Sequence, residues 1–189
     1  MAVARRLGVE DSETRAFLIK SAAELLREEG AGAVTAGRLA AKVGLKRQIV
    51  HYYFGTIEDL LIAVIRRDGD IIRARIAKMM EAGDPLRAIW ERAGNATATV
   101  FELTALAMRR KAVKAEVKKY TQEFRRLEVM ALERYLEAHG LRLRIAPVAA
   151  VFVIHTLAQS IAVERALGVS EGHAQVKAFV EDWLNSVAA

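Results

Sequence analysis

The sequence of 189 residues contains no cysteine, and this absence excludes a disulfide framework, a thiolate metal site and a cysteine nucleophile. It has only two prolines and is 53% hydrophobic, which is typical of a helical globular protein with one sizeable core or two small domains. The N-terminal residues lack the continuous apolar stretch of a signal peptide, so we expect a cytoplasmic protein.

Motifs for catalysis and metal binding are also missing. The four histidines show no ligand spacing such as H-E-x-x-H, and there is neither a glycine-rich phosphate loop nor a G-x-S-x-G elbow. His155 lies in a hydrophobic stretch, which favours a hydrogen-bonded core or pocket histidine over a general base. We therefore expect no catalytic residue, no metal and no cofactor, and a small-molecule enzyme on a helical scaffold is the least favoured alternative.

Acidic residues are absent from residues 30–57, and this window contains four basic residues: Arg38, Lys42, Lys46 and Arg47. The whole chain carries a net charge of +6 and has a pI near 9.8. A surface that approaches phosphate needs acids removed as much as bases added, so the window favours a nucleic-acid partner.

The same window contains the pattern of a helix-turn-helix, TAGRLAAKVGLKRQIVHYYF, from Thr35 to Phe54. Thr35 is a suitable N-cap for a helix that ends at Val43, and Gly44 suits the turn before a second helix that begins at Lys46. Helical spacing in the second helix places Ile49, Val50 and Tyr53 inward and Lys46, Arg47, Gln48, His51 and Tyr52 outward. The alternative is that Gly44 caps an ordinary core helix and the basic residues are solvated.

Residues 15–64 resemble the N-terminal domain of the TetR family of transcriptional regulators. The matching positions are Gly30, Thr35, Leu39-Ala40, Gly44-Leu45, Val50, Tyr53, Phe54 and Glu58 followed by Leu60 and Leu61. The resemblance implies an all-α protein with three parts: a flexible arm (1–12), a three-helix DNA-binding domain (13–56) and a helical domain for ligand binding and dimerisation (57–189). It further implies a homodimer on a palindromic operator and a small apolar effector, with no membrane partner.

Five positions depart from the family pattern. Lys46 stands where Ser or Thr is usual, Gln48 where Gly is usual, and Ile49 where Thr is usual. His51 and Ile57 replace a Tyr and a Lys that are usual phosphate contacts. We therefore expect DNA binding with altered contacts, and the alternative is a helical sensor that has lost specific DNA recognition.

The expected DNA contacts follow from side-chain chemistry. Gln48 can pair with adenine and Arg47 or Lys46 with guanine in the major groove. Phosphate contacts, which orient the protein without specifying sequence, are expected from four further side chains: Thr35, Arg38, His51 and Tyr52.

The remainder of the chain predicts five further helices or helix starts: 57–80, 84–85, 120–139, the segment from Pro147, and 175–187. Small polar residues interrupt the apolar segment 86–107, as in a ligand pocket, although a kinked helix is an equal alternative. The candidate effector residues are Trp90, Asn95, Phe101, Met108, Phe124 and His155. In the family the last two helices form the dimer interface, which implies Val151, Ile154, Ile161, Phe179, Val180 and Trp183; core packing within one chain is the alternative.

Overall fold

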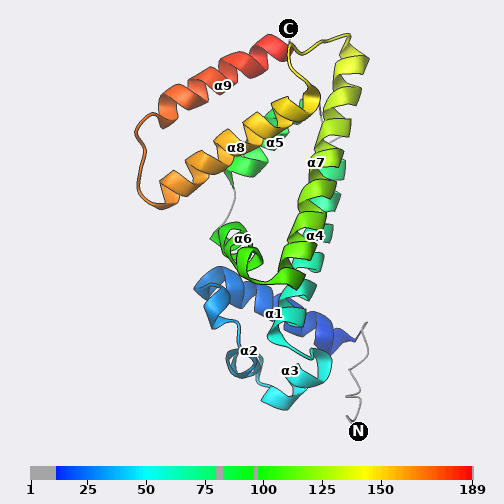
Figure 1. Ribbon diagram of the computed structural model, residues 1–189, viewed down its shortest axis with the longest axis vertical. Helices are drawn as coiled ribbons and strands as arrows, with labels where there is room; N and C mark the ends of the chain where they lie inside the picture. Colours follow the sequence, from blue (N-terminus) through cyan, green and yellow to red (C-terminus); the bar gives the residue numbers. More distant parts are fainter. Residues whose placement is uncertain (1–11, 80–82, 96–97, 189) are drawn as a thin grey trace. The chain divides into compact units, whose positions relative to one another are not determined.

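The computed structural model describes residues 12–79, 83–95 and 98–188, and every regular element in these ranges is a helix (Figure 1). The all-α prediction is therefore confirmed for the described residues. The order is α1 (Glu13–Glu29), the short 3₁₀ helix η1 (Ala31–Ala33), α2 (Ala36–Val43), α3 (Arg47–Tyr53), α4 (Ile57–Met79), α5 (Pro85–Gly94), α6 (Ala98–Arg109), α7 (Lys111–His139), α8 (Pro147–Ala166) and α9 (His173–Ala188). Residues 1–11 of the predicted arm lie outside the described residues, and its last residue, Ser12, is the N-cap of α1.

The chain divides into two compact units. The first comprises Met1–Ile71 and Ala98–Tyr120, and the second comprises Ile72–Thr97 and Thr121–Ala189. Helices α4 and α7 therefore each begin in the first unit and end in the second. The predicted division at residue 56 separates two functions and stays a prediction. By compactness, α6 belongs to the same unit as α1, α2 and α3.

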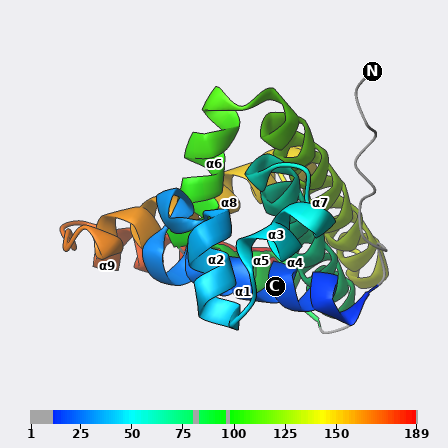
Figure 2. The same cartoon turned by 90° about the horizontal axis from the view of Figure 1, so that it is seen from below.

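The first unit is built on α1, which begins and ends where its sequence dictates. The Ser12 hydroxyl accepts a hydrogen bond from the Arg15 N–H at 3.2 Å, and Gly30 ends the helix with a φ of 82°. The apolar stripe of α1 packs on α2, α3 and the start of α4 in one core, whose fully buried members include Leu18, Ala22, Leu26, Leu39, Val50, Leu60 and Val64. Figure 2 shows α2 and α3 beside α1.

In the second unit, α5 begins as predicted, because the Asp84 carboxylate accepts from the N–H groups of Leu86 and Arg87 at 3.0 and 3.1 Å. The helix ends at Gly94, so the apolar segment 86–107 forms two helices, α5 and α6. Helix α7 begins at Lys111 instead of residue 120, because the preceding lysines and alanines are good helix formers.

Helices α8 and α9 complete the core of the second unit together with α5 and α7. Val151, Ile154, Val180 and Leu184 are each at most 1% exposed. Among the described residues α8 is also the one helix whose length and composition would allow a membrane span, a test that the core helix of a soluble protein passes equally well.

Candidate nucleic-acid interface and neighbouring sites

The helix-turn-helix forms from interactions between residues close in sequence. The Thr35 hydroxyl accepts from the Arg38 N–H at 3.2 Å and caps α2. Gly44 ends α2 in the left-handed region, with a φ of 68°, where a residue without Cβ is unstrained. The next helix, α3, begins at Arg47, one residue later than predicted, with Lys46 as its N-cap.

The outward face of α3 is positive and unpaired. Lys46, Arg47 and Gln48 are exposed, and in the part of the chain that the structure describes neither basic side chain has a carboxylate partner. Val50, at 1% exposure, anchors the opposite face in the core. A short helix held by its inner face and carrying free donors outside is the arrangement that major-groove recognition requires.

Two further positions on α3 differ in exposure. Tyr52 is 48% exposed and its ring meets that of Tyr53 edge-on, with the centroids 5.0 Å apart. His51 is half-buried. Because Ile49 and Tyr53 are also partly buried against the core, the predicted inward set of α3 is confirmed.

The basic residues of α2 are not free. Arg38 pairs with Glu29, and the Lys42 ammonium lies 2.8 Å from a Glu28 carboxylate oxygen, a hydrogen bond that raises the pKa of Lys42. Although residues 30–57 contain no acid, the acidic residues at the end of α1 therefore lie next to the basic residues of α2. These pairs are solvent-exposed and worth about 0–1 kcal/mol each, so a phosphate can compete for Arg38.

The start of α4 explains one departure from the family pattern. The Thr56 hydroxyl accepts from the Asp59 N–H at 3.1 Å, and the Asp59 carboxylate accepts from the Thr56 N–H at 2.9 Å, which forms a capping box. Ile57 is partly buried against the core of the first unit. A packing contact thus takes the place of the usual lysine.

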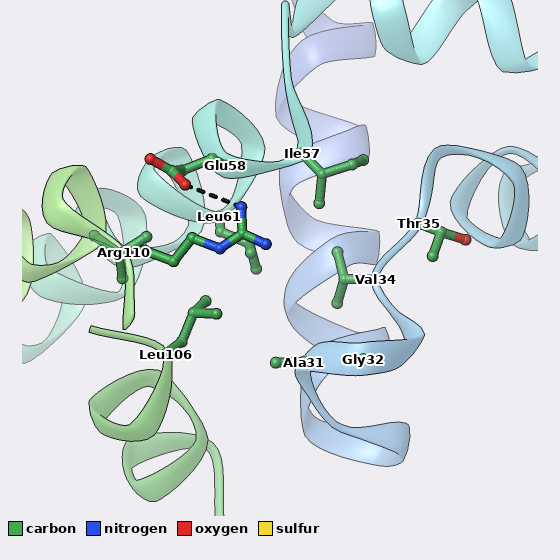
Figure 3. A pocket seen from close by; sticks show the side chains of 10 residues that line it. Ala31, Gly32, Val34, Thr35, Ile57, Glu58, Leu61, Leu106 and Arg110 are labelled. Atoms are coloured by element: carbon green, nitrogen blue, oxygen red, sulfur yellow. Dashed lines mark hydrogen bonds and ion pairs between the residues drawn. The ribbon is translucent and has the colours of Figure 1, made fainter. Parts of the chain in front are cut away.

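A cavity of about 310 Å³ lies in the first unit, near the lower limit for small-ligand pockets (Figure 3). The Arg110 guanidinium reaches over it and donates to Glu58 at 3.2 Å. Its lining consists of Ala31, Gly32, Val34, Thr35, Ile57, Glu58, Leu61, Leu106, Arg110 and Val113. Sequence reasoning missed this cavity because Glu58 and Arg110 are 52 residues apart. Of the predicted site residues only Thr35, a DNA candidate, lines it.

The six candidate effector residues are divided between the two units. Phe101 and Met108 belong to the first unit, where Met108 is 77% exposed and projects to solvent. The others belong to the second unit: Trp90 packs on its core, the Asn95 amide donates to the Glu91 carbonyl at 2.8 Å, and Phe124 and His155 are partly buried. The structure therefore does not gather the six in one compact unit.

Around His155 the structure reveals two partners that the sequence did not indicate. Arg92 on α5 pairs with Glu128 on α7 and lies 3.4 Å from the His155 Nδ1 on α8. Glu128 is 2% exposed, and burial raises its pKa although Arg92 opposes the change. Burial, followed by the charges of Arg92 and Arg125, lowers the pKa of His155 to about 4.

The candidate dimer residues need correction. Four of the six are buried in their own chain, so they have no area to offer a partner: Val151, Ile154, Ile161 and Val180. Trp183 is partly buried on the same core, and Phe179 is 64% exposed. On α8 the exposed apolar side chains are instead Val148, Phe152 and Val153, at 50%, 53% and 45%. For the four buried residues, the alternative interpretation, core packing within one chain, is therefore the correct one.

Comparison with known proteins relates the helix-turn-helix segment to one family of regulators. A model described as bacterial regulatory proteins, tetR family, matches residues 18–64. The HTH-type transcriptional regulator BetI of Rhizobium meliloti (strain 1021) is 33% identical over 81 residues, which are 42% of this chain and 39% of BetI. The match thus spans well under half the length of this curated relative.

Two solved structures show how far the fold extends. The TetR-family regulator from Cytophaga hutchinsonii has a TM-score of 0.77 at 15% identity and covers 95% of this chain and 97% of its own. AibR in complex with isovaleryl coenzyme A and operator DNA has a TM-score of 0.61 at 14% identity and covers 79% of this chain and 86% of its own. At these identities the likeness concerns the fold, and the family match rests on the N-terminal helices. Over residues 18–64 the chain is therefore similar to the tetR family of bacterial regulatory proteins.

Proposed function

We propose that the protein is a sequence-specific DNA-binding transcriptional regulator, a repressor that a small apolar effector releases from a palindromic operator. The observation that carries the proposal is the outer face of α3. There Lys46, Arg47 and Gln48 are exposed and have no acidic partner among the described residues, while Val50 anchors the helix in the core. As a regulator of this kind it would act in the cytoplasm, where bacterial DNA is accessible.

The proposed readout follows from the donors on this face. Gln48 pairs with adenine N7 and N6, and Arg47 or Lys46 pairs with guanine O6 and N7. The phosphate contacts come from Thr35, Arg38, His51 and Tyr52. The Thr35 oxygen already accepts a backbone hydrogen bond, so its O–H remains as the donor to a phosphate.

A palindrome requires two copies of α3 about one DNA turn apart, roughly 34–36 Å. Exposed Phe152 on α8 and Phe179 on α9 support a homodimer through these helices, because exposed apolar residues often mark interaction sites. An effector that prefers one spacing of the two copies changes DNA affinity by linkage. A factor of ~10–100 needs only about 1.4–2.7 kcal/mol.

Selection of bound duplexes from a random DNA pool, at two salt concentrations, tests the proposal. We expect a palindromic motif whose enrichment falls with salt, and Arg47→Ala should weaken it. Arg109→Ala is the matched control, because Arg109 is an exposed arginine of the same unit outside the helix-turn-helix. Binding without any motif would favour the alternative, a sensor that has lost specific recognition.

Light scattering on Phe179→Glu and Phe152→Glu tests the dimer. Both residues are more than half exposed, so the chain itself should tolerate the charge. We expect monomers with unchanged helicity, and an unchanged dimer mass in both variants would exclude this face as the interface.

A further inference from the structure

The cluster of Arg92, Glu128 and His155 joins three helices in the interior of the second unit. Helices α5 and α8 lie side by side, next to α7 (Figure 1). Arg92 contacts the Glu128 carboxylate with one terminal nitrogen, and the same nitrogen lies 3.4 Å from His155 Nδ1. The contact therefore draws one polar side chain from each helix to a common point.

The charges of this cluster do not cancel. Arg125, one turn before Glu128 on α7, acts electrostatically on both Glu128 and His155, and its guanidinium lies 4.8 Å from the Phe152 ring centroid. His155 is neutral at pH 7, since its pKa is near 4. Two guanidinium groups thus face one carboxylate, which leaves one positive charge in excess.

The cluster also has an unused hydrogen-bond donor. A neutral histidine whose Nδ1 faces a guanidinium must accept there, so its proton is on Nε2. The buried Arg92 Nε has no hydrogen-bond partner among the described residues. An unsatisfied buried donor in a native structure requires an explanation.

Stability alone does not explain the cluster. Removing an ion pair from water costs several kcal/mol per ion, and well-packed apolar residues of similar volume are often equally stable or better. The excess positive charge and the unpaired N–H donor of this cluster add to the cost of burying it. A bound anion would supply the missing negative charge and accept from the free N–H group.

We propose that this cluster binds the carboxylate of a small apolar acid, so that the effector of the proposed regulator is a monocarboxylic acid with an aliphatic or aromatic body. Arg92 and Arg125 supply the charge, and His155 donates from Nε2. The body lies against Phe124, which shares a face of α7 with Glu128 because it is four residues away. This assignment rests on the proposed function for its regulatory meaning, but not for the binding itself.

Titration of the full-length protein without DNA tests the binding. The probes are octanoate and benzoate, each compared with its uncharged amide and with octyltrimethylammonium. We expect the acids to raise the Tm and to alter the tryptophan fluorescence, and the other compounds to act much more weakly. Arg125→Met should weaken acid binding on the order of tenfold or more, as loss of a charged hydrogen-bond partner does. Arg109→Met is the control and should bind the acids like the wild type.

A second variant removes Arg92 without leaving the buried Glu128 carboxylate unpaired. The double substitution Arg92→Met with Glu128→Leu removes both charges, so it should fold and lose acid binding. Acid binding that survives both variants overturns the inference, and so does a preference for the ammonium compound or acid affinity weaker than about 1 mM. A release of operator DNA by the acids is measured separately: binding without release contradicts the regulatory role and leaves the site intact.

Discussion

The helix-turn-helix of the first unit carries ion pairs at the surface, whereas the second unit contains a pair whose carboxylate is buried. Arg38–Glu29 and Lys42–Glu28 lie in water, beside the face proposed to approach DNA. In the second unit the Glu128 side chain is only 2% exposed. Exposed pairs can be exchanged for phosphate at little cost, whereas buried charges are expensive and must be matched by fixed partners. The two units thus suit two kinds of partner, a polyanion at a surface and a small anion in an interior.

The largest expected effect comes from breaking the buried pair. Glu128→Ala leaves Arg92 as an uncompensated charge and should cost about 3–5 kcal/mol of unfolding free energy. Glu29→Ala, in an exposed pair, should cost less than about 1 kcal/mol. Urea denaturation measures both. The double variant Glu128→Ala with Arg92→Met should recover much of the loss, and equal losses in the two single variants would refute the contrast between the units.

The pH dependence of stability sharpens the same contrast. The folded pKa of His155 is near 4 and its ordinary value is 6.5, so the unfolded chain binds this proton more readily. Stability should therefore fall as the pH drops from 6.5 to 4, by up to about 3 kcal/mol from this residue. The raised pKa of Glu128 acts in the opposite direction, because the folded state then binds its proton at higher pH. In the His155→Gln variant the urea midpoint should depend less on pH between 4 and 6.5 than in the wild type. Parallel plots of midpoint against pH for the two proteins would contradict the assignment.

On the DNA face, Gln48→Ala should relax the base preference at one operator position by about 1–3 kcal/mol of discrimination. The selection experiment measures this as a change in the motif. Tyr52→Phe is the matched control, since loss of a proposed phosphate contact should lower affinity without changing the motif. An unchanged motif in the Gln48 variant would remove this residue from the readout.

The smallest effect is expected at the rim of this face. Glu29→Gln frees Arg38 and removes one negative charge, so DNA affinity at low salt should rise by less than about 1 kcal/mol. Fluorescence anisotropy with a labelled operator measures the change. Glu133→Gln, an exposed site in the second unit, should leave the affinity unaltered. Equal affinities of wild type and Glu29→Gln would indicate that Arg38 does not face the phosphates.

The helix-turn-helix could be predicted from the sequence because its determinants are local. The cap bond joins Thr35 to Arg38, three residues apart, and the turn needs a glycine at 44. The apolar residues of α1 and of the inner face of α3 recur at the helical period. Their spacing along the sequence therefore indicates which side of each helix is buried. The start of α5 at Asp84-Pro85 is equally local.

The sites of the second unit depended on the tertiary structure. Arg92 meets Glu128 across 36 residues and His155 across 63, and no helical period connects such positions. Helix α8 is apolar on more than one face, so its sequence could not indicate that Val151 and Ile154 turn into their own core while Phe152 stays outside. The sequence by itself determined the caps at Thr35 and Asp84, the turn at Gly44 and the helix-turn-helix, because each needs only neighbours along the chain. Which apolar face is buried and which charges meet in the interior was decided by packing, because burial is a property of the assembled helices.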